Sequence, residues 1–406
     1  MLSQFTVKNY KSIRDELTFD MQATAISEHT DRLIKASNNE LLLPVSAIYG
    51  PNGGGKSNVL QALHTLELKV LRPLYATESD MNSRLRMKNL EIVPFAFDEE
   101  SKNSPTEFEI FFQTTKAEYR YILHVLRETI VYESLSMRKV ETNRTTDIFE
   151  REDGKISMGD GFSKLKVSED ISDTLPLLSY LGITYRKNEV VGDCISWFEG
   201  GIEFLNYGSP IQELQLAIAN SADIKELILN MIREMDLDIE DFRVERREAG
   251  DIQVFTKHNV DGNAYEINLS EESSGTRKLF GLLPFIAESL TKGTALVIDE
   301  LDAKIHPVLL KHIIMLYNNL EINKHGAQLI FTSHDLSTMN SEVFRRDEIW
   351  FVAKGNEQNS KLYSLVEFKN PDGSSVRKDA KFDKQYLEGK YGANPYLKKL
   401  IDWSVI

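Results

Sequence analysis

The chain has 406 residues, of which 48 are Lys or Arg and 62 are Asp or Glu, giving a formal net charge of −14. This excess of acidic residues argues against a protein that coats nucleic acid, because non-specific binding to phosphates needs a surplus of Lys and Arg. One cysteine, Cys194, excludes a disulfide framework within the chain, and no stretch approaches the run of about 18 apolar residues of a membrane span, so we expect a cytoplasmic protein with no membrane partner.

The first 50 residues predict a β-hairpin followed by a fully buried strand. In "FTVKNYKSI", Phe5 and Val7 alternate with polar residues, and "ELTFDM" repeats this alternation, which is typical of two paired strands. The next apolar run, "LLLPVSAIYG", includes Val45 and Ile48 and lacks such alternation. Continuous apolar runs are typical of strands covered on both faces of a parallel sheet.

Residues 50–57, "GPNGGGKS", follow this strand directly and fit the phosphate-binding P-loop pattern G-x-x-x-x-G-K-[ST]. Glycines let backbone N–H groups close around phosphates at the start of the helix predicted by "SNVLQALHTL". We expect Lys56 to bridge the β- and γ-phosphates of ATP and the Ser57 hydroxyl to ligate Mg²⁺. A plain flexible loop is the weaker alternative, because the flanking strand and helix fit the motif. The residues expected to bind nucleotide here are Asn52, Gly53, Gly54, Gly55, Lys56, Ser57 and Asn58.

In the middle of the chain the predicted secondary structure changes twice. Between residues 106 and 157, alternating runs such as "TEFEIFFQ" and "YRYILHV" predict antiparallel strands joined by short turns, one of them at Asp153-Gly154. From 172 to 238 a helical period takes over. Parallel-strand signals return at "TALVIDE" and "AQLIFTSHD". The sheet is therefore predicted to be split in sequence by an inserted lobe.

The segment "LSEESSGTRKLFGLLPFIAESL" predicts a helix that opens at Ser273 and Gly275. A serine and a glycine at a helix start present free N–H groups and the positive end of the helix dipole, which suits an anion. An ordinary helix cap is the alternative interpretation. The position of the segment between the P-loop and the next acidic motif favours the anion site.

The strand "ALVIDE" ends in two carboxylates, as in a Walker B element. Asp299 is expected to hold Mg²⁺, because hard oxygen ligands suit that ion, and Glu300 is expected to activate water as a general base. His334 follows the strand "QLIFTS", where it could stabilise a γ-phosphate, although a lone histidine at a strand end is often structural. Asp302 lies on the loop between Glu300 and the helix that Pro307 starts.

The order of "NYKSI", "GPNGGGKS", "ESSGT", "LVIDE", "LDAKIHP" and "FTSHD" resembles ABC-type ATPase heads of the SMC, Rad50 and RecF kind. The resemblance implies an α/β P-loop head with a mixed sheet and an inserted lobe of antiparallel strands and helices. It also implies that Ser273 and Gly275 contact a γ-phosphate held by a second head, and that Lys11 reaches the phosphates. His334 would be the switch histidine and Asp302 the D-loop aspartate.

The same resemblance suggests four segments. Residues 1–94 and 251–345 would form the two parts of the ATPase head, 95–250 the inserted lobe, and 346–406 an extension of the head. SMC and Rad50 proteins carry a long coiled coil, whereas this sequence has no heptads. The segment "EIVPFAFDEE", where a Q-loop glutamine is expected, contains no glutamine.

The C-terminal stretches "DEIWFVAKG" and "VRKDAKFDKQYLEGKYGANPY" resemble RloA-like and abortive-infection ATPases of prokaryotic phage defence. That likeness implies an ATP-hydrolysing switch with ATP and Mg²⁺ as cofactors, a homodimer or higher homo-oligomer through the heads, and a separate effector, often a nuclease. We expect no nuclease within the chain. A RecF- or Rad50-like DNA-binding ATPase is the alternative, and a transporter ATPase subunit is a weaker one.

Overall fold

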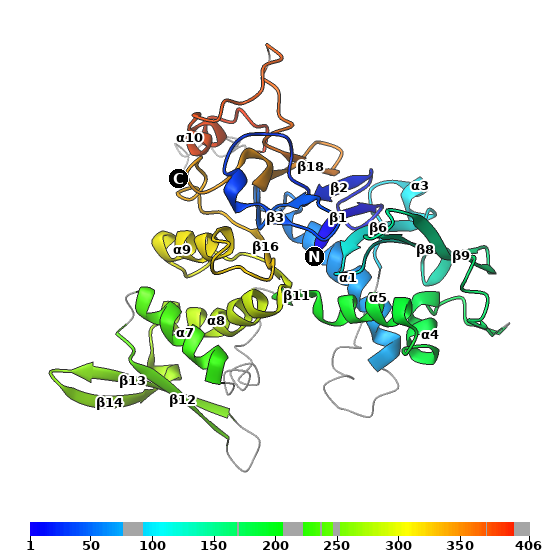
Figure 1. The fold of residues 1–406 in the computed structure, drawn as a ribbon. Coiled ribbons are helices and arrows are strands. Elements are labelled where there is room, and N and C mark those ends of the chain that lie inside the picture. Colours follow the sequence, from blue (N-terminus) through cyan, green and yellow to red (C-terminus); the bar gives the residue numbers. More distant parts are fainter. Residues whose placement is uncertain are drawn as a thin grey trace, which may run out of the picture.

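The computed structural model describes residues 1–75, 92–168, 170–205, 222–235, 238–246, 252–370 and 372–393. Within these residues the strands form sheets of seven, six, three and two strands, and helices pack between and beside the two large sheets (Figure 1). The fold is therefore of the α/β class with mixed sheets, as predicted. In this part of the chain no helix combines the length and the apolar composition that crossing a bilayer demands.

The seven-stranded sheet is antiparallel and contains the predicted N-terminal hairpin. Phe5 lies opposite Phe19 within the hairpin and opposite Ile110 on the other side, so the hairpin and the later meander share one sheet. Asp153 and Gly154 have positive φ angles of 47° and 80° and form the predicted turn. In sheet order the strands are β10 (Lys155–Met158), β9 (Thr145–Glu152), β8 (Thr129–Lys139), β7 (Ala117–Leu126), β6 (Thr106–Gln113), β1 (Leu2–Lys8) and β2 (Leu17–Asp20).

The six-stranded sheet contains the strand that precedes the P-loop. All neighbours from β11 to β17 are parallel, and β18 is antiparallel to β17. Every residue of β5 is buried, which explains its continuous apolar sequence. In sheet order the strands are β11 (Ile202–Leu205), β15 (Ala295–Ile298), β16 (Gln328–Thr332), β5 (Val45–Tyr49), β17 (Ile349–Lys354) and β18 (Ser360–Ser364).

The two faces of this sheet belong to two different cores. Ile48 packs in a core with the helices that lie against the seven-stranded sheet, whereas Val45 and Ala47 pack in a core with the helices of the opposite side (Figure 1). Successive side chains of β5 therefore point to opposite faces of the sheet and pack into the two different cores. The first group of helices is α1 (Lys56–Tyr75), α4 (Leu177–Thr184) and α5 (Glu189–Gly200), and the second is α7 (Ala222–Glu234), α8 (Ser274–Lys292) and α9 (Pro307–Asn318).

Helix boundaries follow local signals in the sequence. Asn188 caps α5 by accepting from the N–H groups of Val190 and Val191, and Pro307 occupies the first turn of α9. Helix α8 ends at Gly293, whose φ of 73° is left-handed. The remaining short helical elements are α3 (Glu99–Lys102), α10 (Phe382–Leu387), η1 (Thr30–Arg32), η3 (Leu269–Glu271) and η4 (Arg346–Glu348).

A small antiparallel sheet projects beside α7 and α8 (Figure 1). Phe242 and Val254 attach it to the core that contains α7 and α8, and the Phe242 ring meets the Phe280 ring edge-on at 5.6 Å between centroids. Its strands are β12 (Asp241–Arg246), β13 (Ile252–Val260) and β14 (Asn263–Asn268), and the two-stranded sheet consists of β3 (Ile34–Lys35) and β4 (Leu41–Leu42).

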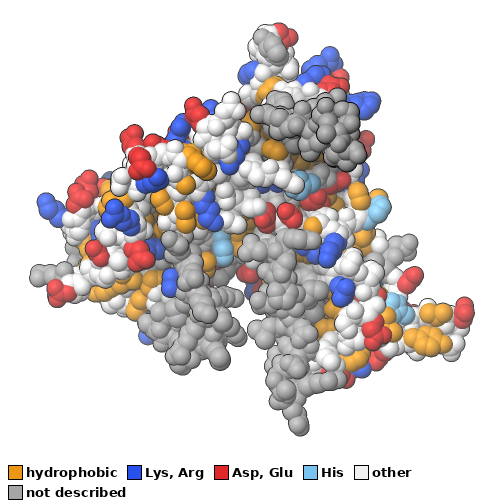
Figure 2. All heavy atoms as spheres, turned by 180° about the vertical axis from the view of Figure 1, so that it is seen from behind, with side chains coloured by type: hydrophobic (Ala, Val, Ile, Leu, Met, Phe, Trp, Pro, Cys, Tyr) orange, Lys and Arg blue, Asp and Glu red, His pale blue; other side chains and the backbone are white. Residues whose placement is uncertain are grey.

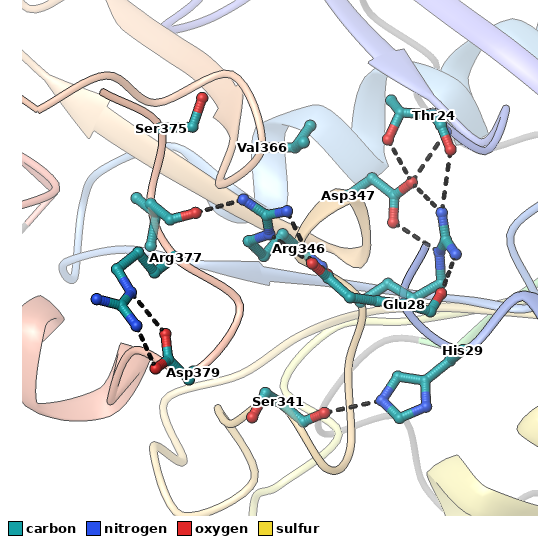
Figure 3. Close-up of polar contacts among 12 residues, drawn as sticks. Thr24, Glu28, His29, Ser341, Arg346, Asp347, Val366, Ser375, Arg377 and Asp379 are labelled. Atoms are coloured by element: carbon teal, nitrogen blue, oxygen red, sulfur yellow. Dashed lines mark hydrogen bonds and ion pairs between the residues drawn. The ribbon is translucent and has the colours of Figure 1, made fainter. Parts of the chain in front are cut away.

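A buried polar network fastens the segment after β2 to the segment before β17 (Figure 3). Arg345 donates to both carboxylate oxygens of Asp347, at 2.9 and 2.7 Å, and the Thr24 hydroxyl donates to the same carboxylate at 2.7 Å. Arg346 donates to Glu28 at 2.9 Å. Because each buried charge has a partner, the network holds the start of β17 in place without leaving a charge unpaired.

Candidate active site

The carboxyl ends of β15, β16, β5 and β17 meet at one cavity of about 390 Å³. Ligands of open parallel sheets bind at this edge of the sheet. The cavity brings together eight of the residues that the sequence nominated, although these come from three distant segments. Its lining residues are Ser12, Pro51, Asn52, Gly53, Gly55, Lys56, Ser57, Asn58, Glu300, His334 and Lys354.

The glycines of the P-loop are required by its backbone and by close packing. Gly53 and Gly55 have φ angles of 74° and 109°, which side-chain-bearing residues rarely adopt. A Cβ atom on Gly55 would lie 2.3 Å from Ser360 Oγ and 2.8 Å from Ser12 Oγ. Ser360 Oγ in turn donates to Gly54 O at 2.7 Å and bonds to Ser12 Oγ at 2.7 Å. The loop is therefore fastened to Ser360, which is bonded in turn to Ser12, a residue that lines the cavity.

Lys56 is the first residue of α1, so the cavity lies at the positive end of that helix. Its Nζ atom donates to Gly50 O at 2.9 Å and to Pro51 O at 3.4 Å, and the residue is only 6% exposed. Burial lowers the pKa of Lys56, while the carboxylates of Asp299, Glu300 and Asp302 act in the opposite direction. A cation whose hydrogen-bond partners are neutral carbonyls suits a site for an anion.

Thr332, the last residue of β16, connects the two adjacent carboxylate residues of the Walker B element. Its hydroxyl donates to Asp299 Oδ1 at 2.6 Å and accepts from the backbone N–H of Glu300 at 2.7 Å. Glu300 has a φ of 54°, a left-handed backbone that is uncommon outside glycine. Held in this way, the Glu300 side chain lines the P-loop cavity.

Asp299 faces a smaller hollow beside the main cavity, and Ser57 lines both spaces. A serine hydroxyl and a carboxylate are hard oxygen donors, which is the ligand type that Mg²⁺ prefers. Thr332 occupies one carboxylate oxygen of Asp299 through its hydrogen bond. The residues present therefore fit a magnesium site formed by Ser57 and Asp299.

His334 and Asp302 are linked to one another. The backbone N–H of His334 donates to Asp302 Oδ2 at 3.1 Å, and the histidine side chain lines the cavity, whereas Asp302 does not. The other carboxylate oxygen, Oδ1, is buried without a hydrogen-bond partner among the described residues. Asp302 thus fixes the position of the loop that carries His334.

Ser273 and Gly275 lie outside this cavity. Ser273 caps α8, because its Oγ accepts from the N–H of Thr276 at 3.1 Å. A Cβ atom on Gly275 would lie 3.3 Å from Lys304 O, so the start of α8 lies against the loop that follows Glu300. Within one chain, the helix start predicted to bind an anion does not line the P-loop cavity.

Lys11 is also outside the residues that line the cavity. Its Nζ atom donates to Gln61 Oε1 at 2.6 Å, and its backbone N–H donates to Val93 O at 2.8 Å. Gln61 lines the small hollow with Ser57 and Asp299. The predicted contact of Lys11 with phosphate remains a prediction, and the structure connects this lysine to the P-loop helix instead.

Four residues around the site were not identified from the sequence: Ser12, Thr332, Lys354 and Ser360. Ser12 directly follows Lys11 in "NYKSI", and Thr332 stands in the strand that precedes His334, so their motifs offered a signal. Lys354 lies in the quoted stretch "DEIWFVAKG" without having been assigned a role there, and Ser360 stands in no motif; both reach the site because β17 lies beside β5 and β18 lies beside the P-loop.

Comparisons with known proteins give a family and several distant structures. Residues 45–340 match the model of the family described as "AAA domain, putative AbiEii toxin, Type IV TA system". None of the curated proteins matches the sequence. Among solved structures, the Smc head bound to the C-winged helix domain of ScpA is 16% identical with a TM-score of 0.49, over 89% of this chain and 97% of that one. The SMC head domain from Thermotoga maritima is 15% identical with a TM-score of 0.42, over 89% and 98%. The Smc head of Pyrococcus furiosus bound to the C-terminal domain of ScpA is 13% identical with a TM-score of 0.43, over 89% and 96%.

Proposed function

The chain belongs to this family of AAA domains, and we propose that it is an ATP-hydrolysing switch that controls a separate effector protein in anti-phage defence. The observation that carries the proposal is the single cavity that gathers the P-loop, Glu300 and His334 at adjacent strand ends. Phosphoryl transfer depends mainly on positioning and on electrostatic stabilisation, and these groups supply both. ATP is the substrate under this proposal.

Each group has a distinct task in hydrolysis. The N–H groups of the P-loop and Lys56 would hold the β- and γ-phosphates at the positive end of α1. Ser57 and Asp299 would hold Mg²⁺, which neutralises charge on the phosphates when it is bound. Glu300 would accept a proton from the attacking water, and Thr332 would keep the two Walker B residues in register.

A second copy of the chain would complete the site. Ser273 and Gly275 lie outside the cavity of their own chain, although serine and glycine at a helix start suit a phosphate. We propose that in a homodimer or higher homo-oligomer these residues contact the γ-phosphate held by the neighbouring P-loop. ATP would then close the heads, and hydrolysis would let them open.

The family description, "putative AbiEii toxin, Type IV TA system", links the proposal to toxin–antitoxin systems, and control of a separate effector is our own extension of that link. The distribution of charge supports a protein effector over DNA, since the formal net charge is −14. On the face drawn in Figure 2, acidic and basic side chains are interspersed among the described residues, without a continuous basic band. Extended basic surfaces are the usual signature of DNA-binding proteins.

The test uses two variants and measures mass by light scattering with and without ATP and Mg²⁺. Glu300→Gln keeps the binding groups and removes the base, so it should accumulate as a nucleotide-bound pair. Adding Gly275→Arg should abolish the pairing while calorimetry still detects ATP binding. Val260→Arg, an exposed position on the projecting sheet, is the matched control and should leave pairing intact.

Two results would contradict the proposal. If Glu300→Gln shows no ATP-dependent association, or if association survives Gly275→Arg, the composite site is wrong. Sub-micromolar binding of DNA with a steep salt dependence would instead favour the RecF-like alternative.

A further inference from the structure

A second and larger cavity, of about 590 Å³, lies at the opposite end of α1 from the P-loop. Its described walls are the last turns of α1, the turn between β7 and β8, and the segments around residues 92–106 and 174–176. With a rise of 1.5 Å per residue, Lys69 is about 20 Å along the helix from Lys56. The lining residues are Lys69, Arg72, Pro73, Ile92, Pro94, Lys102, Ser104, Thr106, Val125, Arg127, Glu128, Thr174 and Pro176.

The described lining of this cavity is mainly positively charged, whereas the chain as a whole is negatively charged. Among the residues that the structure describes, four cationic side chains line it, from α1, α3 and the turn between β7 and β8, against the single carboxylate of Glu128. The chain as a whole carries a formal charge of −14. Like charges that converge on one space repel one another, so the arrangement is stabilised when an anion enters it.

Three of the four cations have no counter-ion in contact. Lys69, Arg72 and Arg127 make no hydrogen bond or ion pair within the part of the chain that the structure describes, whereas Lys102 pairs with Glu99 at 2.5 Å. Lys69 and Arg72 are three residues apart and therefore lie on the same face of α1. Their free donors are available to a ligand in the cavity.

Lys69 is partly withdrawn from water. Burial lowers the pKa of its amine, while the carboxylates of Glu128 and Glu133 raise it and Arg72 lowers it further. Glu133 is already engaged, because its carboxylate accepts from the backbone N–H groups of Leu177 and Leu178 at 2.7 and 2.9 Å. Within the described part of the chain, Glu128 is thus the acidic residue that lines the cavity with Lys69.

The remaining walls are apolar and suit an organic group. Ile92, Val125 and three prolines line the cavity beside the cations. Its volume lies within the range of about 300 to 1,000 Å³ that is typical of small-molecule sites. We propose that this cavity binds a small organic phosphate of nucleotide size, with Lys69, Arg72 and Arg127 holding the phosphate groups. The site is separate from the P-loop and does not depend on ATP hydrolysis.

The experiment is titration calorimetry with ADP on the Lys56→Ala chain, in which the P-loop site is disabled. We expect one molecule of ADP to bind. Lys69→Gln with Arg72→Gln should weaken this binding at least tenfold. Lys116→Gln, an exposed lysine paired with Glu189, removes the same charge elsewhere and should leave the binding unchanged.

Arg127→Gln provides a second test, because this exposed turn residue can be replaced without disturbing α1. It should also weaken ADP binding if Lys69→Gln with Arg72→Gln fails to fold. Absence of binding to the Lys56→Ala chain overturns the proposal, and so does binding that survives both sets of variants. A single-stranded oligonucleotide that displaces ADP and binds more tightly would make the ligand a nucleic acid and would overturn the assignment to a small molecule.

Discussion

Replacing Gly55 by alanine should damage the P-loop far more than the same change at Gly53. Both glycines have left-handed φ angles, of 109° and 74°, so either substitution forces alanine into a disfavoured conformation. The two sites differ in what a Cβ atom would meet. At Gly53 nothing lies within 4 Å, whereas at Gly55 the Cβ atom would lie 2.3 Å from Ser360 Oγ.

The magnitudes follow from these contacts. The left-handed backbone costs alanine about 1–2 kcal/mol at either site. At Gly55 the Ser360 hydroxyl must also move by roughly 1 Å to reach an ordinary contact distance, and it then loses its bonds to Ser12 Oγ and Gly54 O. Each lost bond costs about 1 kcal/mol. We therefore expect the free energy of unfolding to fall by about 3–4 kcal/mol for Gly55→Ala and by about 1–2 kcal/mol for Gly53→Ala.

Urea unfolding without nucleotide measures both costs, and calorimetry with ATP and Mg²⁺ measures the effect on binding. Ser360→Gly removes the nearest atoms that the new Cβ would strike and leaves Ser12 Oγ at 2.8 Å, so in that background the extra cost of Gly55→Ala over Gly53→Ala should shrink. Equal costs for the two alanine variants in the wild-type background would refute the reasoning, as would a Gly55→Ala cost that Ser360→Gly leaves unchanged.

Three further predictions address the site and the core. Lys56→Ala should abolish ATP binding at the P-loop, because it removes the charge that neutralises the phosphates; in the Lys69→Gln, Arg72→Gln background, where the second cavity is disabled, unchanged ATP affinity in calorimetry would contradict the P-loop assignment. Thr332→Val keeps the shape of the side chain but removes the hydroxyl between Asp299 and Glu300, so the rate of ATP hydrolysis should fall about tenfold to a hundredfold, and an unaltered rate would exclude this positioning role. Burial, together with the charge of Asp347, raises the pKa of Glu348 from 4.5 to about 8. The unfolded chain therefore loses this proton first, and the free energy of unfolding should fall by about 1.4 kcal/mol per pH unit between these two values, about 5 kcal/mol in total. Glu348→Gln should abolish this slope in urea unfolding, and an identical slope in the variant would show that another group titrates.

The sequence alone was sufficient for the features that depend on neighbouring residues. The P-loop, the helix that starts at Lys56 and the carboxylates after β15 each occupy one continuous stretch, and their periodicity and spacing were visible there. The hairpin and the turn at Asp153-Gly154 were confirmed for the same reason, because turn geometry is set by a few adjacent residues. Even the edge of the sheet that carries the site follows from the rule for parallel strands.

Only the tertiary structure decided which of these stretches lie together. Pairing of β6 with β1, and of β11 with β15, depends on contacts between residues far apart in the chain, and no local pattern encodes the choice of partner. The same holds for side chains. Thr332 joins Asp299 to Glu300 because β16 lies beside β15, and Ser360 supports the P-loop because β18 lies at the edge of the same sheet. The basic cavity arises likewise, since Lys69 and Arg127 converge only when α1 packs against the turn between β7 and β8.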